Sequence, residues 1–312
     1  MDSARERPAE RSDRVLVTGG TGTLGRLVVP RLRDAGCQVR VLSRRSREAP
    51  GEDTEKASRE GAGEGAAEDA AGVEFVTGDL ATGEGIDAAV AGVEIVVHCA
   101  GTSKGDGEKA RHLVRAASPA GVRHLVFISV VGADRVPVVS AVDRAIFGYY
   151  GSKLAAERVV ADSGVPWTTL RTTQFHDLIL MVARQAAKLP VVPALAAFRF
   201  QPVDIGEAAD RLVELALGPP AGLVPDLAGP RVYAMAELLR GYLRARGKRR
   251  PILPIRLPGQ AARALRASAN LAPDRAVGHR TWEEFLADRA GSAHHPGSSP
   301  DPSSKAARTA DR

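Results

Sequence analysis

Three polar side chains in the middle of the chain have types and spacing suited to proton transfer. Tyr149 and Lys153 are four residues apart, so on a helix they share one face, and Ser129 ends an earlier apolar run. A phenol has an unperturbed pKa of about 10, and an ammonium group one helical turn away lowers that pKa by favouring the phenolate. A nearby serine hydroxyl can hold a carbonyl or alcohol oxygen. We expect an acid–base site, although a Tyr–Lys pair taken alone also fits an exposed helix surface.

A glycine-rich turn near the N-terminus indicates what this site works with. Gly19, Gly22 and Gly25 have the spacing G-x-x-G-x-x-G directly after the apolar run Val15–Val17. Helical spacing of apolar residues follows at Leu24, Leu27, Val28 and Leu32. A strand, a glycine turn and a helix together seat a pyrophosphate against backbone N–H groups. We therefore predict dinucleotide binding rather than an ordinary turn, with hydride transfer coupled to proton transfer.

The residues after the second expected strand favour NADP(H) over NAD(H). The strand Gln38–Leu42 is followed by Ser43, Arg44 and Arg45, with no acidic residue among them. An acid at this place holds the ribose 2′-OH of NAD, whereas an arginine holds the 2′-phosphate of NADP. The arginines also fit the start of the polar loop 48–72, which contains no large apolar residue. We predict that this loop is a disordered insertion.

Strands and helices alternate as far as residue 172, which predicts the α/β class with a Rossmann-type, doubly wound parallel sheet. The expected strands are 15–17, 38–42, 73–80, 93–101, 123–129 and 167–172. The expected helices are 24–35, 86–90, 106–119 and 147–160. In such sheets ligands bind at the carboxyl ends of the strands.

Two of these strand ends carry candidate cofactor residues. Asp79 and Leu80 end the third strand and suit an adenine ring, although an aspartate there also fits the cap of the next turn. Ala100 and Gly101 end the fourth strand, where small residues let a ligand approach the backbone. We interpret the preceding pair His98–Cys99 as packing residues and predict no metal site, because no further ligands stand nearby in the sequence.

The elements after residue 173 do not alternate as cleanly, so we predict a small C-terminal substrate lobe with the closing elements. The expected elements are helices 174–188, 205–217, 236–246, 258–270 and 282–289 and strands 198–203, 232–233 and 252–255, with Asp204 capping the second helix. The predicted divisions are a disordered tail 1–13, a dinucleotide-binding domain 14–173, the lobe 174–290 and a second disordered tail 291–312.

Composition limits the classes of partner. The 312 residues are 44% hydrophobic and carry 43 Lys+Arg against 37 Asp+Glu, a net charge of +6. The cluster Arg244–Arg250 fits a solvated helix end better than a nucleic-acid contact. Cys37 and Cys99 suit thiols in a reducing cytoplasm, and the apolar stretch Leu178–Ala197 is interrupted by charges and prolines. We expect a cytoplasmic protein with a small-molecule substrate, no nucleic acid, no membrane span, and a monomeric or homodimeric state.

The chain resembles the short-chain dehydrogenase/reductase superfamily over roughly residues 14–217. The turn Thr18–Gly25 matches the form found in the extended and atypical branches. The segments Tyr150–Arg158, Gly164–Thr168 and Leu170–His176 are similar to those of the atypical, NmrA-like NAD(P)H-binding proteins.

This resemblance implies roles for individual residues. The residues implied in cofactor binding are Gly19, Gly22, Thr23, Leu24, Gly25, Ser43, Arg44, Arg45, Asp79, Leu80, Ala100, Gly101 and Lys153. Those implied in catalysis are Ser129, Tyr149 and Lys153, and those implied in the substrate pocket are Gln174, Phe175 and His176. The asparagine that the superfamily often places on the helix after the fourth strand is missing, since the chain's one asparagine is Asn270.

The functional expectation is an NADP(H)-dependent oxidoreductase acting on a small carbonyl, quinone-like or alcohol substrate. Tyr150 stands next to Tyr149, so the sequence leaves open which phenol faces the cofactor. Three other functions stay open: a redox-sensing regulator that binds NADP(H) without turnover, an epimerase or dehydratase that uses NAD, and a scaffold that uses the fold alone.

Overall fold

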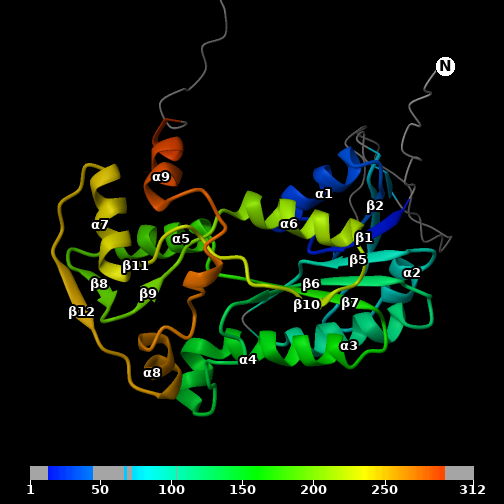
Figure 1. Ribbon diagram of the computed structural model, residues 1–312, viewed down its shortest axis with the longest axis horizontal. Helices are drawn as coiled ribbons and strands as arrows, with labels where there is room; N and C mark the ends of the chain where they lie inside the picture. The colour runs from blue at the N-terminus through cyan, green and yellow to red at the C-terminus, as the bar shows by residue number, and fades with distance from the viewer. Residues whose placement is uncertain (1–12, 45–66, 69–71, 103, 292–312) are drawn as a thin grey trace, which may run out of the picture.

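The computed structural model describes residues 13–44, 67–68, 72–102 and 104–291. The strands of its central sheet are β1 (Arg14–Thr18), β2 (Gln38–Ser43), β3 (Ala67–Glu68), β4 (Glu74–Thr77), β5 (Ile95–His98), β6 (His124–Val130), β7 (Trp167–Thr172) and β10 (Gly222–Leu223). Their order in the described sheet is β10-β7-β6-β5-β1-β2-β4-β3 (Figure 1), and only β3 runs antiparallel to its neighbour. The predicted α/β class and doubly wound sheet are confirmed.

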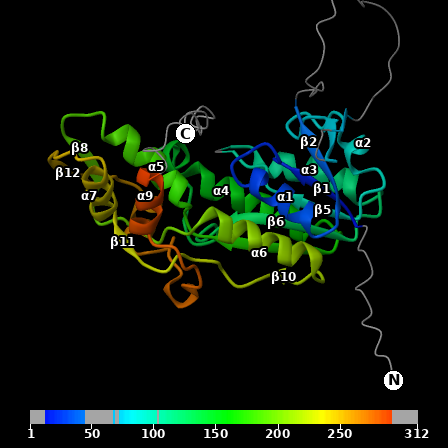
Figure 2. The ribbon, with the colours of Figure 1, turned by 90° about the horizontal axis from the view of Figure 1, so that it is seen from above.

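Helices cover both faces of the sheet, which is why its central strands are apolar throughout. On β1, Val15 and Val17 pack into one core cluster and Leu16 into another, because alternate side chains of a strand point to opposite faces. The first cluster is closed by α1 (Gly25–Asp34) and α6 (Ile205–Leu217). The second is closed by α2 (Ile86–Val90), α3 (Asp106–Ala117) and α4 (Ala141–Ala161). The sheet is therefore a buried middle layer, with α6 above it and α3 and α4 below it in Figure 1, and Figure 2 looks down on these layers from above.

The strand order reverses at β1, which lies between β2 and β5. This reversal opens a crevice outside the carboxyl ends of these strands, the place where doubly wound sheets bind ligands. The loop after β1 contains the glycine turn, and the loop after β5 begins at Cys99.

A second lobe lies beside the sheet and is built from later parts of the chain (Figure 1). Its helices are α5 (His176–Ala186), α7 (Met235–Ala245), α8 (Gln260–Arg266) and α9 (Trp282–Gly291), with a short 3₁₀ turn at Pro273–Arg275. Its strand pairs are β8 (Val192–Leu195) with β12 (Ile252–Ile255) and β9 (Arg199–Phe200) with β11 (Tyr233–Ala234). Although α6 and β10 follow residue 173, they return to the sheet, so the lobe consists of the other late elements.

Several element bounds differ from the sequence expectations. The helix expected from residue 147 begins at Ala141, because Ser140 and Asp143 form a reciprocal capping box there. The strand expected at 198–203 is reduced to β9, and the helix expected at 258–270 to α8. Asp204 caps α6 as expected, accepting from Gly206 N at 2.7 Å.

The short strands β8 and β10 were not expected, and β3 lies inside the loop predicted to be disordered. β3 forms because the edge of β4 still offers backbone groups for pairing. Both predicted terminal tails, most of the predicted insertion, and Arg45 lie outside the described residues, apart from Asp13 and Gly291 at the tail boundaries.

Trp282 joins three helices of the lobe. Its side chain is fully buried, and its Nε1 donates to Leu238 O of α7 at 3.0 Å. Its ring stacks on His176 of α5 with 6.0 Å between ring centroids, and on Phe285 of its own helix at 5.5 Å. The lobe therefore depends on one large aromatic side chain at its centre.

We expect Trp282→Ala to lower the free energy of unfolding by about 3–5 kcal/mol, since it leaves a large cavity and an unpaired carbonyl. Urea denaturation followed by circular dichroism measures this change. The control Val277→Ala removes an exposed side chain and should change the free energy by less than about 0.5 kcal/mol. Equal midpoints for the two variants would contradict the proposed role of Trp282.

Candidate functional site

The glycine turn brings the start of α1 against the ends of β1 and β5. A Cβ on Gly25 would lie 2.2 Å from Gly19 O, and one on Gly19 would lie 2.7 Å from Ala100 N. Gly19 also has a φ of +71°, which only glycine adopts readily. Side chains at these two positions would push the three segments apart, so the glycines are required for the close packing of the turn.

The N-terminus of α1 is open to an anionic ligand. No side chain caps it, and its first turn contains no acidic residue. The unused N–H groups and the helix dipole there suit a phosphate.

A cavity of about 580 Å³ extends from this turn along the strand ends. Of the residues predicted to bind cofactor, it is lined by Gly19, Gly22, Thr23, Leu24, Gly25, Ser43, Arg44, Asp79, Leu80, Ala100 and Gly101. Lys153 lines a different cavity, described below, and Arg45 lies outside the described residues. The structure thus gathers eleven predicted positions around one hollow of dinucleotide size, although their roles stay predictions.

Both side chains expected at the adenine end line this cavity. Leu80 is buried, and Asp79 Oδ1 accepts from Ala81 N at 2.8 Å. That hydrogen bond is the turn-capping alternative considered for Asp79, and it occupies one carboxylate oxygen. The other oxygen of Asp79 can still accept from a ligand amine.

Sequence reasoning missed three polar residues of the cofactor-side cavity, Thr21, Thr102 and Lys109. Lys109 of α3 and Thr102 both line it, and Lys109 Nζ donates to Thr102 Oγ1 at 2.5 Å. Lys109 is a second positively charged side chain that lines this cavity, besides Arg44. In the sequence Lys109 looks like an ordinary solvated helix lysine, so no signal there separated it from its neighbours.

A second cavity of about 430 Å³ adjoins the first. Leu24, Cys99 and Gly101 line both cavities, so the two meet at the ends of β5 and the glycine turn. The second cavity also contains all three predicted catalytic residues, Ser129, Tyr149 and Lys153, together with Tyr150.

Lys153 is held by a buried acid that the sequence did not single out. Its Nζ lies 3.3 Å from Asp106 Oδ2 and donates to Ile128 O at 3.2 Å. Burial lowers the pKa of Lys153 below its ordinary value, and the Asp106 carboxylate offsets part of that fall. Asp106 begins α3, the helix on which the resemblance implied an asparagine, and it also accepts from Thr102 N at 2.9 Å.

The two tyrosines occupy different environments within the second cavity. Tyr149 is 39% exposed and Tyr150 is 9% exposed, with their rings edge to face. Lys153 Nζ lies 5.8 Å from the centroid of the Tyr149 ring. Desolvation raises the pKa of both phenols, that of Tyr150 to about 12, and the Asp106 carboxylate adds to the rise at Tyr149. The direction of these shifts is opposite to the lowered tyrosine pKa expected from the Tyr–Lys spacing.

Ser129 lies near the end of β6 with its side chain buried. Within the described part of the chain its Oγ has no hydrogen-bond partner. A buried hydroxyl without a partner costs free energy unless a ligand supplies one, so Ser129 is suited to donate to a ligand oxygen.

The three residues predicted for the substrate pocket are divided by the structure. Gln174 and Phe175 line the second cavity, but His176 does not. The His176 ring is buried in the lobe, 4.9 Å from the Phe285 ring, and burial lowers its pKa to about 4. His176 is the first residue of α5, and the direction of the helix there points its side chain toward α9 rather than toward the cavity.

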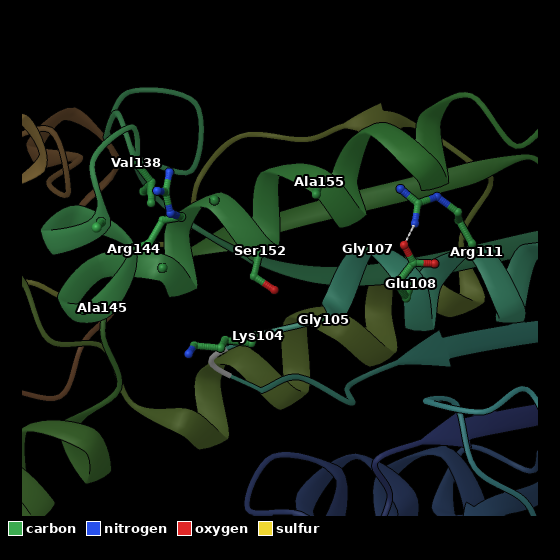
Figure 3. A pocket seen from close by; sticks show the side chains of 13 residues that line it. Lys104, Gly105, Gly107, Glu108, Arg111, Val138, Arg144, Ala145, Ser152 and Ala155 are labelled. Carbon is green, nitrogen blue, oxygen red and sulfur yellow. Dashed lines mark ion pairs between the residues drawn. The ribbon is translucent and has the colours of Figure 1, made fainter.

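A third hollow of about 690 Å³ lies between α3 and α4 and contains none of the predicted site residues (Figure 3). Lys104 and Arg144 line it from the two sides, and Glu108 pairs with Arg111 along α3.

In the described ranges no three His, Cys, Asp or Glu side chains gather as metal ligands. None of the described helices has the length and apolar character needed to cross a bilayer.

Comparison with known proteins adds a family and several relatives. A family model described as NAD(P)H-binding matches residues 19–179, about half of the chain. The chain is 30% identical to a ceramide reductase of Caulobacter vibrioides over 262 residues, which cover 78% of this chain and 74% of that protein. It is 34% identical to a (4-alkanoyl-5-oxo-2,5-dihydrofuran-3-yl)methyl phosphate reductase of Streptomyces griseus over 58% of this chain, but spans only 55% of that protein.

Solved structures share the fold at low sequence identity. An NADPH-dependent quinone oxidoreductase of Escherichia coli, solved in complex with NADPH, superimposes with a TM-score of 0.68 and 18% identity, covering 88% of this chain and 99% of that one. A UDP-glucose 4-epimerase of Thermus thermophilus in complex with NAD has a TM-score of 0.62 and 21% identity, covering 90% and 99%. The family model and the match to the ceramide reductase identify the chain as a member of the NAD(P)H-binding family.

Proposed function

We propose that the protein is an NAD(P)H-dependent reductase of a small carbonyl or quinone-like substrate. The observation that carries this proposal is the junction of the two cavities at Leu24, Cys99 and Gly101. A dinucleotide bound by the glycine turn would lie along the first cavity, and the residues at this junction would face the part of it that enters the second cavity. Ser129 and Tyr149 line this second cavity. Relatives named as reductases support the same class of reaction.

The bound cofactor would supply a hydride to the carbonyl carbon. Tyr149 donates its phenolic proton to the carbonyl oxygen, so the products are an alcohol and the oxidised cofactor. Tyr149 is protonated at neutral pH, as an acid must be, but its raised pKa makes proton donation harder, and the Lys153 ammonium offsets this by favouring the phenolate. Ser129 Oγ holds the same oxygen by donating a hydrogen bond.

Lys153 acts on Tyr149 and on the cofactor side. Its ammonium, fixed by Asp106, stabilises the phenolate that remains after proton donation. Because Gly101 would meet Lys153 Nζ at 2.8 Å if it carried a Cβ, the same ammonium also lies against the cofactor-side backbone.

We assign the proton donor to Tyr149 rather than Tyr150. Tyr149 is four residues before Lys153 and has the ammonium near its ring, whereas Tyr150 packs with Phe147 and Phe198 in an apolar cluster. Tyr150 therefore serves mainly to shape the cavity.

Replacing each tyrosine by phenylalanine tests this assignment with a matched pair. Tyr149→Phe should lower kcat at least about 100-fold, the usual worth of a general acid, while Tyr150→Phe should stay within about tenfold of the unchanged protein. NADPH oxidation with a panel of ketones, aldehydes and quinones measures turnover, and calorimetry should give the same NADPH affinity for all three proteins. A larger loss in Tyr150→Phe would move the donor to that residue.

Turnover that survives in both variants would contradict the acid–base site. NADPH binding with no oxidation of NADPH by any compound of the panel would instead favour a redox-sensing regulator.

We also propose that NADPH is preferred over NADH. Arg44 is exposed and lines the cofactor-side cavity, and the described residues at the end of β2, Ser43 and Arg44, include no acid to hold a ribose hydroxyl. A guanidinium there pairs with a 2′-phosphate.

Arg44→Ala should weaken NADPH binding about tenfold and leave NADH binding nearly unchanged, because only NADPH carries the 2′-phosphate. Titration of each cofactor by calorimetry measures both affinities. Arg33→Ala removes the same charge from the far end of α1 and should alter neither affinity appreciably. Equal losses for NADPH and NADH in Arg44→Ala would contradict recognition of the phosphate.

A further inference from the structure

The second cavity is lined by a few polar groups and by many apolar side chains. Ser129, Lys153 and the tyrosine hydroxyls supply its chemistry, while most of its other side chains are aliphatic or aromatic. Among the described lining residues, Lys153 is the one charged side chain, and it is already paired with Asp106. A carboxylate or phosphate on the ligand would therefore enter this cavity without a counter-ion of its own, at a large desolvation cost. The cavity suits an uncharged ligand.

The mouth of this cavity continues into two exposed apolar helix faces. Ile146 of α4 and Leu178 of α5 line the cavity, although they are 49% and 44% exposed. One turn away on α4 stands Val142, and one turn away on α5 stand Met181 and Val182, all of them exposed. The spacings i, i+3 and i, i+4 place each set on one face of its helix.

Exposed apolar side chains are common one at a time, but a group that rims a cavity needs an explanation. Ile146 and Leu178 line the cavity itself, and the other three residues lie one helical turn farther along the same two helix faces, so a ligand that fills the cavity can extend onto them. We refer to Ile146, Leu178, Val142, Met181 and Val182 as the rim strip.

We infer that the substrate is an uncharged carbonyl compound carrying a long alkyl chain, with its carbonyl at Ser129 and Tyr149 and its chain lying on the rim strip. This inference rests on the proposed reductase function. In the reaction the carbonyl carbon gains the hydride from NAD(P)H and the carbonyl oxygen gains the Tyr149 proton, giving the long-chain alcohol and NAD(P)⁺. The alkyl chain takes no part in the chemistry and contributes binding alone.

A series of methyl ketones of increasing chain length tests the inference, at concentrations too low for the longer members to self-associate. We expect kcat/KM with NADPH to rise about two- to fourfold per added methylene, as the chain covers apolar surface, and to level off once the chain has passed the strip. A value of kcat/KM independent of chain length would overturn the inference while leaving the reductase function intact.

A matched pair of variants tests where the alkyl chain of the substrate binds. The double variant Leu178→Ser, Met181→Ser should lower the ratio of kcat/KM for the longest ketone to that for the shortest about tenfold. Leu253→Ser replaces a comparably exposed leucine of β12 that lines neither cavity, and it should keep the ratio of the unchanged protein. The same ratio in all three proteins would overturn the rim strip as the site of the chain.

Binding of the matching primary alcohols separates this inference from the proposed function. Their affinities for the NADPH-loaded protein, measured by calorimetry, should rise with chain length in the same way. Chain-dependent alcohol binding without reduction of any ketone would support the strip and contradict the reductase. If light scattering shows dimers that the double variant abolishes, a second copy of the chain occupies the strip and the inference is overturned.

Discussion

The ion pair between Lys153 and Asp106 is the contact on which both cavities depend. It joins α4 to α3 beneath the end of β5, where Gly101 leaves room for the ammonium. Moving a lysine and an aspartate out of water is costly, and a pair of this kind is stable only if its remaining hydrogen bonds are satisfied. Ile128 O accepts from the lysine, and Thr102 N donates to the aspartate. Removing Asp106 would leave the buried Lys153 ammonium without its acid, whereas Asp106 without Lys153 would still have Lys109 at 3.5 Å.

Local spacing was sufficient for the features that the backbone itself determines. The glycine turn, the strands at the middle of the sheet and the small residues after β5 could be predicted because each follows from a short run of sequence. The sequence also predicted that Ser129 and the Tyr–Lys pair belong to one site, and all three residues line the second cavity. Ser129 lies near the carboxyl end of its strand, the edge at which parallel sheets bind ligands.

Features that depend on how helices cross could not be read from spacing. Asp106 meets Lys153 only because α3 packs on α4, and the sequence separates them by 47 positions. Burial raises the pKa of Tyr149 and that acid adds to the rise, whereas the expected lowering considered the lysine alone. The family resemblance implied His176 in the substrate pocket together with Gln174 and Phe175, yet the start of α5 turns its ring into the lobe.

The strands at the two ends of the described sheet, β10 and β3, are two residues long each. Unpaired backbone groups on a long outer strand invite the strand of another molecule, the first step toward fibre-like stacking. Because each edge strand of the described sheet has only two residues, it presents few backbone groups to another strand, and the sheet is a poor template for such growth. In the described part of the chain, the sheet therefore offers little free backbone at its edges to a strand of another copy.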